Sequence, residues 1–148
     1  MSARDPAVAE RWALAVLRVS LGAFLLLWAV EKFVIPTTTV RIWDHFYGVG
    51  LAASLVPLVG AIESVLALAI VVGLWRRVTY GLGLLLHGVS VLSSWRQLID
   101  PWGLRSGGSP NHLFLAGVPV LAAFLALYLM RARDGWTLDE WRLRQRNP

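Results

Sequence analysis

The sequence is short of cysteine, of lysine and of charge in general. It contains no cysteine, which excludes disulfide exchange, thiolate nucleophiles, iron–sulfur clusters and cysteine-ligated zinc within this chain. Charged residues make up 16% of the total, whereas a soluble domain carries about 25%. Lys32 is the only lysine, so the net charge of +5 comes from arginine. With a hydrophobic content of 57%, these shortages favour an integral protein of the lipid bilayer over a nucleic-acid-binding protein.

Four long apolar runs follow one another along the chain. They cover residues 12–33, 51–74, 78–95 and 113–130. Each has about 18 to 24 residues, enough for a helix rising about 1.5 Å per residue to cross about 30 Å of hydrocarbon. A spanning segment must satisfy its own backbone hydrogen bonds, so the runs predict helices. We expect an all-α, polytopic membrane four-helix bundle that forms one domain over residues 1–148.

The distribution of arginine predicts the orientation of this bundle. The two chain ends and the second connection hold nine basic residues, against four in the other two connections. The positive-inside rule then places both termini in the cytoplasm, for a multi-pass protein of a bacterial-type cytoplasmic (inner) membrane.

The segments outside the runs predict further local structure. Residues 34–50 contain Trp43, Phe46 and Tyr47, which predict a helix or turn lying in the headgroup region. Residues 96–111 contain prolines and glycines, which predict an ordered turn followed by a flexible link. In the cytoplasmic tail, residues 131–148, the stretch "TLDE" places Thr137 three residues before Glu140. This capping-box pattern predicts a short C-terminal helix lying at the membrane interface.

Polar residues inside the first three runs share one stripe of each helix with small residues. The stripes are Arg18, Gly22, Leu25, Ala29 and Lys32; Gly60, Glu63 and Ala67; and Tyr80, Gly83, His87, Val91 and Ser94. Small residues mark the faces on which membrane helices approach closely, so these stripes predict the interior of the bundle.

Depth along the helices predicts the partner of Glu63. Counted from the cytoplasmic edge, Arg18 lies about 10 Å deep, His87 about 15 Å, Glu63 about 20 Å and Lys32 about 30 Å. Helical side chains lean towards the amino end of their own helix, so Lys32 and Glu63 lean towards each other while Arg18 leans away. We predict a Lys32–Glu63 pair with His87 as a second neighbour. An Arg18–Glu63 pair is the second-ranked alternative.

The chain resembles the DoxX family of small four-helix membrane proteins, which includes the DoxD-like subunit of thiosulfate:quinone oxidoreductase. The resemblance lies in "LRVSLGAFLLLWAVEKF" and "VGAIESVLALAIVVGLWRR", and the final "GWTLDEW" also fits. Residue by residue it covers Arg18, Gly22, Lys32, Glu63, Gly73 and Arg77. It implies a membrane subunit associated with redox chemistry. Without cysteine, the chain cannot take the thiol-linked roles proposed for some relatives.

Three functions are compatible with these residues. In a redox-linked subunit that binds quinone, Glu63 and His87 are the candidate catalytic groups that handle protons, and Trp28, Lys32, Glu63 and His87 are the candidate quinone-binding residues. In a non-catalytic accessory subunit that packs against a larger membrane complex, the polar pairs only tie helices together. A small-solute transporter is the weakest reading, because repeated broken helices are missing. We favour a subunit that depends on other membrane subunits over an enzyme acting alone.

Two histidines and two aspartates lie in the predicted outward loops. These are Asp44, His45, Asp100 and His112. Their spacing matches no known ligand pattern, so we interpret them as solvated loop residues and predict no metal site.

Overall fold

The computed structural model describes residues 5–105 and 112–146, and the regular elements in this part of the chain are all helical. In chain order they are α1 (Pro6–Val34), α2 (Pro36–Ile42), a π-helical turn η1 (Trp43–Tyr47), a 3-10 turn η2 (Ala53–Leu55), α3 (Val56–Val72), α4 (Arg76–Ser93), α5 (Trp95–Ile99), a 3-10 segment η3 (His112–Ala116), α6 (Gly117–Leu129) and α7 (Leu138–Arg146). The all-α class is confirmed for these residues.

Three helical segments in the described chain are long and apolar enough to cross a membrane. They are Pro6–Val34, Ala53–Val72 and His112–Leu129. They correspond to the first, second and fourth predicted runs. The third run corresponds to α4, which is less apolar because it begins with Arg76 and Arg77 and contains His87.

The helix ends differ from the predicted runs for local reasons. α1 starts at Pro6, not at residue 12, because the Asp5 carboxylate accepts a hydrogen bond from the Ala7 N–H at 2.9 Å and caps the helix. α3 starts at Val56, not at residue 51, after the η2 turn. It ends at Val72, where Gly73, with a φ of 68° that suits glycine, caps the helix.

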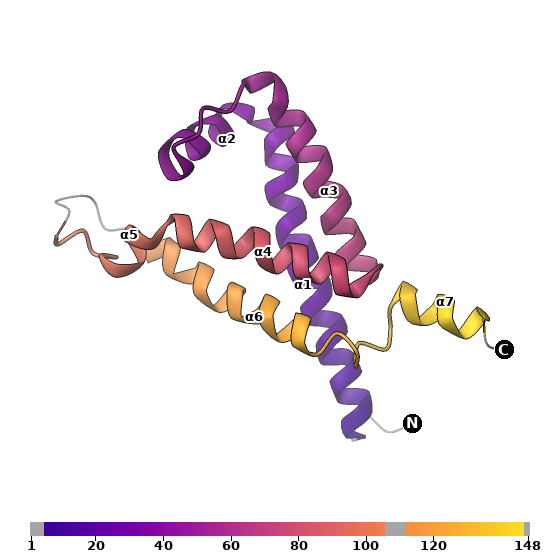
Figure 1. Cartoon of the computed structure of the whole chain (residues 1–148). Helices are drawn as coiled ribbons and strands as arrows, with labels where there is room; N and C mark the ends of the chain where they lie inside the picture. The colour runs from indigo at the N-terminus through magenta and orange to yellow at the C-terminus, as the bar shows by residue number, and fades with distance from the viewer. Residues whose placement is uncertain (1–4, 106–111, 147–148) are drawn as a thin grey trace.

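The helices form two packed pairs. α1 packs mainly along α3, and α4 packs mainly along α6. Figure 1 shows that the α4–α6 pair crosses α1 obliquely and diverges from its upper half, while α7 lies to one side of α1, next to the turn between α3 and α4. The buried core lies where the pairs cross and is formed by Leu14, Leu21, Leu25, Ala67, Ile70, Tyr80, Phe124 and Leu127.

The predicted interior stripes are buried except at Glu63, which is partly exposed, while Gly60 and Ala67 of the same stripe on α3 are buried. On α1 the buried set includes Arg18, Gly22, Leu25, Ala29 and Lys32, and on α4 it includes Tyr80, Gly83, His87 and Val91. Gly22 shows why small residues are needed: a Cβ there would lie 3.0 Å from the carbonyl oxygen of Ala67. The close approach of α1 and α3 therefore depends on these positions.

The two long connections are partly helical. Residues 34–50 form α2 and η1, as predicted, and the Phe46 ring of η1 lies 5.5 Å from the Phe114 ring of η3. This contact joins the first connection to the start of the last apolar helix. The predicted flexible link falls largely on residues 106–111, which lie outside the described residues.

Candidate functional site

Lys32 and Glu63 form an ion pair between α1 and α3. The Lys32 Nζ lies 2.6 Å from Glu63 Oε2, and the two side chains are 10% and 15% exposed. The same ammonium donates a hydrogen bond to the Trp28 carbonyl at 3.2 Å. The pairing predicted from depth and side-chain direction is therefore confirmed.

Gly60 brings the two backbones close enough for this pair. A Cβ on Gly60 would lie 3.0 Å from Lys32 Cβ and 3.1 Å from the Ala29 carbonyl oxygen, so a larger residue would push the helices apart. The Ser64 hydroxyl donates to the Gly60 carbonyl at 2.8 Å. A charge in apolar surroundings is tolerated when it is paired and hydrogen-bonded, and this arrangement suits a fixed interhelical tie.

Arg18 contacts the C-terminal segment and not Glu63. Its Nη2 donates to the Trp136 carbonyl at 2.9 Å, and its Nε lies 3.7 Å from Asp134 Oδ2. The alternative Arg18–Glu63 pair is wrong, because Arg18 leans towards the amino end of α1 and meets Asp134 there. Arg18 Nε and Nη1 and Asp134 Oδ1 are buried without a hydrogen-bond partner in the described chain, so charge attraction joins the two groups.

Asp134 is fully buried at the centre of a polar network. The Tyr80 hydroxyl donates to its Oδ2 at 2.7 Å, and Arg76 Nη1 donates to its backbone carbonyl at 2.5 Å. We call Arg18, Arg76, Tyr80 and Asp134 the Asp134 network. It ties α1 and α4 to the segment between α6 and α7.

The start of α4 is capped by the tail. The Asp139 carboxylate accepts hydrogen bonds from the backbone N–H groups of Trp75, at 3.0 Å, and Arg76, at 2.9 Å. Trp75 has a φ of 49°, in the left-handed region that residues other than glycine rarely adopt. A helix start leaves N–H groups without intrahelical partners, and here a residue far along the sequence satisfies two of them.

The tail helix α7 is held by an ion pair to α4 and by a cap at its own start. Arg76 Nη2 lies 2.6 Å from Glu140 Oε1, and the Thr137 hydroxyl accepts a hydrogen bond from the Glu140 N–H at 3.2 Å. The predicted Thr137 cap and the helix after it are confirmed, since α7 begins at Leu138.

Sequence reasoning missed the Asp134 network. It treated residues 131–148 as a cytoplasmic tail with a short helix at the membrane interface and assigned no partner to Asp134. A usable signal was present, because Arg18 needs a carboxylate and leans towards the end at which Asp134 follows the last apolar run. The distance of more than a hundred residues in sequence concealed the pairing.

His87 is buried among aromatic rings and does not join Glu63. Its Nε2 lies 3.0 Å from the Gly117 carbonyl oxygen, and its ring lies 5.5 Å from Phe24 and 5.6 Å from Phe124. Among the described residues no hydrogen bond or ion pair connects His87 with Glu63, so the predicted second neighbour is not in place. A neutral His87 can donate Nε2–H to the carbonyl, an assignment that depends on the tautomer.

Trp28 lines a groove on a different face of α1. The groove has a volume of about 380 Å³ and is lined by Phe24, Leu27, Trp28 and Glu31. The Phe24 ring contacts both Trp28, at 6.4 Å between centroids, and His87. Of the four candidate quinone-binding residues, Trp28 lines this groove, whereas Lys32, Glu63 and His87 do not.

His45 and His112 lie apart from any cluster of metal ligands among the described residues. The His45 ring contacts Phe46 at 4.7 Å, and the His112 ring contacts Trp102 at 6.2 Å. Within residues 5–105 and 112–146, no three histidine, aspartate or glutamate side chains are grouped so that they could hold a metal. The Asp100 carboxylate accepts hydrogen bonds from the backbone N–H groups of Leu104 and Arg105.

Comparisons with known proteins return no relative: no protein-family model, no curated protein and no solved structure matches this chain.

Proposed function

We propose that this chain is a non-catalytic subunit of a redox-linked membrane assembly, with the four-helix architecture of the DoxX family. The observation that carries the proposal is the 2.6 Å Lys32–Glu63 pair, with His87 bonded elsewhere. The ionisable groups expected to handle protons are instead paired in contacts that join helices. A buried pair of this kind can fix the arrangement of helices without taking part in a reaction, which favours the subunit role over a proton-handling site.

The contacts of the chain ends support four crossings. Arg133 Nη1 lies 3.2 Å from Glu10 Oε1, and the Trp12 and Trp136 rings lie 4.6 Å apart. The segment after α6 therefore lies beside the first turns of α1. Both ends on one side of a membrane require an even number of crossings, and this supports α4 as a fourth crossing helix besides the three more apolar ones. Positive-inside bias puts that side in the cytoplasm of a bacterial-type inner membrane.

Single-cysteine labelling tests this topology, because the chain has no cysteine of its own. We expect Ser2→Cys and Gln145→Cys to react with a membrane-impermeant maleimide only from the cytoplasmic side. Gly50→Cys and Leu104→Cys should react only from the opposite side. If α4 does not cross, Leu104→Cys will instead react from the same side as Ser2→Cys. Gln145→Cys will then react from the same side as Gly50→Cys. That result would remove the four-span architecture.

Purification in a mild detergent tests the subunit role. We expect the tagged chain to leave the membrane in a stoichiometric complex whose partner carries the redox cofactor, visible as haem or flavin absorbance. We expect the isolated chain to show no quinone reductase activity. A chain that purifies alone and reduces quinone would contradict the non-catalytic reading.

Quinone binding is a second candidate function, and the groove on α1 favours it. Its volume of about 380 Å³ falls in the range of ligand sites, about 300–1,000 Å³, and it offers the Trp28 indole beside apolar side chains. The groove lies on the part of α1 from which α4 and α6 diverge in Figure 1, where a lipophile could enter from the bilayer.

Matched tryptophan substitutions test the groove. Trp28→Ala should lose most of the quinone that co-purifies with the protein, because the ring that lines the groove is removed. Trp95→Ala removes another half-exposed tryptophan outside the groove and should keep it. Measuring bound quinone by extraction and chromatography gives the answer. If both variants retain the same amount of quinone, the groove is not a quinone site. The proposal of a non-catalytic subunit would then stand alone.

A further inference from the structure

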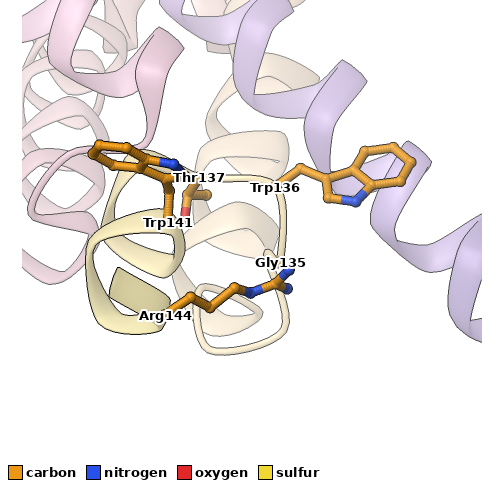
Figure 2. A pocket seen from close by; sticks show the side chains of 5 residues that line it. All are labelled: Gly135, Trp136, Thr137, Trp141 and Arg144. Carbon is orange, nitrogen blue, oxygen red and sulfur yellow. The ribbon is translucent and has the colours of Figure 1, made fainter. Parts of the chain in front are cut away.

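A second hollow lies at the tail end of the molecule. It has a volume of about 240 Å³ and is lined by Gly135, Trp136, Thr137, Trp141 and Arg144. Figure 2 shows the Arg144 side chain extending from α7 towards Gly135, with Trp141 and Trp136 to either side. The hollow is formed by the turn before α7 and by one face of α7 itself.

Two guanidinium groups from opposite ends of the chain flank Gly135. Arg144 approaches it from α7, and a Cβ on Gly135 would lie 3.4 Å from Arg11 Nε of α1. Neither arginine makes an ion pair within the part of the chain that the structure describes. The carboxylates nearby are already engaged: Glu10 with Arg133, Glu140 with Arg76, and Asp139 with the start of α4. The hollow therefore carries positive charge that its own surroundings do not neutralise.

Its aromatic residues suit a membrane interface. Trp12, which packs on Trp136, and Trp141 are 59% and 58% exposed. Tryptophan rings gather at headgroup level, and guanidinium groups bind phosphate through two parallel hydrogen bonds. The Asp134 network holds the turn that carries Gly135 and Trp136, and this turn forms one wall of the hollow.

We propose that this hollow binds the phosphate of an anionic phospholipid from the leaflet on the tail side. Arg11 and Arg144 hold the phosphate oxygens at Gly135, and the acyl chains lie outside against Trp12 and Trp141. A volume of about 240 Å³ accommodates a headgroup phosphate and not a whole lipid. The inference goes beyond the proposed subunit role and depends only on the protein lying in a bilayer.

The test is lipid retention by the intact protein in detergent, measured by native mass spectrometry with phosphatidylglycerol or phosphatidylcholine added. We expect the protein to retain one phosphatidylglycerol in preference to phosphatidylcholine. Arg11→Gln with Arg144→Gln should weaken that retention about tenfold or more, since each basic residue near an anionic lipid contributes measurably to binding. Arg77→Gln with Arg142→Gln removes the same charge from outside the hollow and is the matched control. If both double variants lose phosphatidylglycerol retention equally, the loss comes from the lower net charge of the protein. That result would overturn the proposed lipid site.

Gly135→Leu keeps both arginines and fills the hollow. Gly135 has ordinary space around a Cβ and no positive φ, so this variant should fold, and it should lose the retained lipid. Full retention by a folded Gly135→Leu protein would contradict the site. Inorganic phosphate added at the same concentration should not displace the lipid. Displacement would show that a soluble phosphate is the ligand and would overturn the lipid assignment. Failure here leaves the cysteine-labelling topology intact, so the two proposals are judged separately.

Discussion

Asp134→Ala is expected to lower the free energy of unfolding by about 3–5 kcal/mol, because it leaves the buried Arg18 guanidinium without its carboxylate. Asp134 is fully buried and Arg18 is 5% exposed, so water cannot replace the lost partner. The Tyr80 hydroxyl loses its acceptor in the same change. Thermal unfolding in detergent, followed by tryptophan fluorescence, measures the loss, and limited proteolysis should show faster cleavage between α6 and α7.

A double substitution distinguishes the loss of the Arg18–Asp134 pair from a general loss of packing in the core. Arg18→Met with Asp134→Leu removes both charges and should recover much of the stability, since a buried ion pair is often replaced by apolar residues without loss. Tyr80→Phe keeps the carboxylate and should cost less, about 1–3 kcal/mol. If the losses from Arg18→Met and Asp134→Leu simply add in the double variant, the two residues are not coupled and our account of the network is wrong.

Lys32→Ala is the second substitution with a large expected effect, about 3–5 kcal/mol, because Glu63 would remain as an unpaired carboxylate within the bundle. Glu63→Gln should be tolerated better. Lys32 lies near the end of α1, its flexible stem lets the ammonium reach the interface, and the Trp28 carbonyl still accepts its hydrogen bond. Combining Lys32→Ala with Glu63→Gln should recover much of the loss, as read from melting temperatures in the same detergent.

Two controls accompany this series. Glu31→Gln removes the neighbouring carboxylate on α1, which lines the groove and has no ion pair in the described chain, and should change the melting temperature little. Arg18→Ala should not be rescued by Glu63→Gln, since Arg18 pairs with Asp134. Rescue of Arg18→Ala without rescue of Lys32→Ala would reverse our assignment of the pairs.

The parts of this structure that follow a regular period were predictable from the sequence. The stripe from Arg18 to Lys32 on α1 and the stripe from Tyr80 to Val91 on α4 repeat every three or four residues, and both are buried. The Lys32–Glu63 pair followed from rise per residue and side-chain direction, which depend only on helix geometry.

The parts that depend on non-periodic contacts were not predictable in the same way. Asp134 and Asp139 lie in turns and helix starts, where hydrophobic spacing gives no direction for a side chain. Their partners, Arg18 and the backbone at Trp75 and Arg76, are distant in sequence. His87 was placed at the right depth, but depth alone did not say which neighbour it faces, and it faces Gly117. The crossing of the two helix pairs likewise follows from packing that no single stripe contains.

The cap that Asp139 places on α4 has a consequence for biosynthesis. α4 is made early in the chain, yet two of the N–H groups at its start are satisfied by a carboxylate that leaves the ribosome more than sixty residues later. Until the tail emerges, the N–H groups of Trp75 and Arg76 lack the Asp139 carboxylate, and Arg18 lacks Asp134. The final arrangement of the helices at this end must therefore be completed after the last apolar segment has been inserted. The C-terminal segment works as the closing step of assembly.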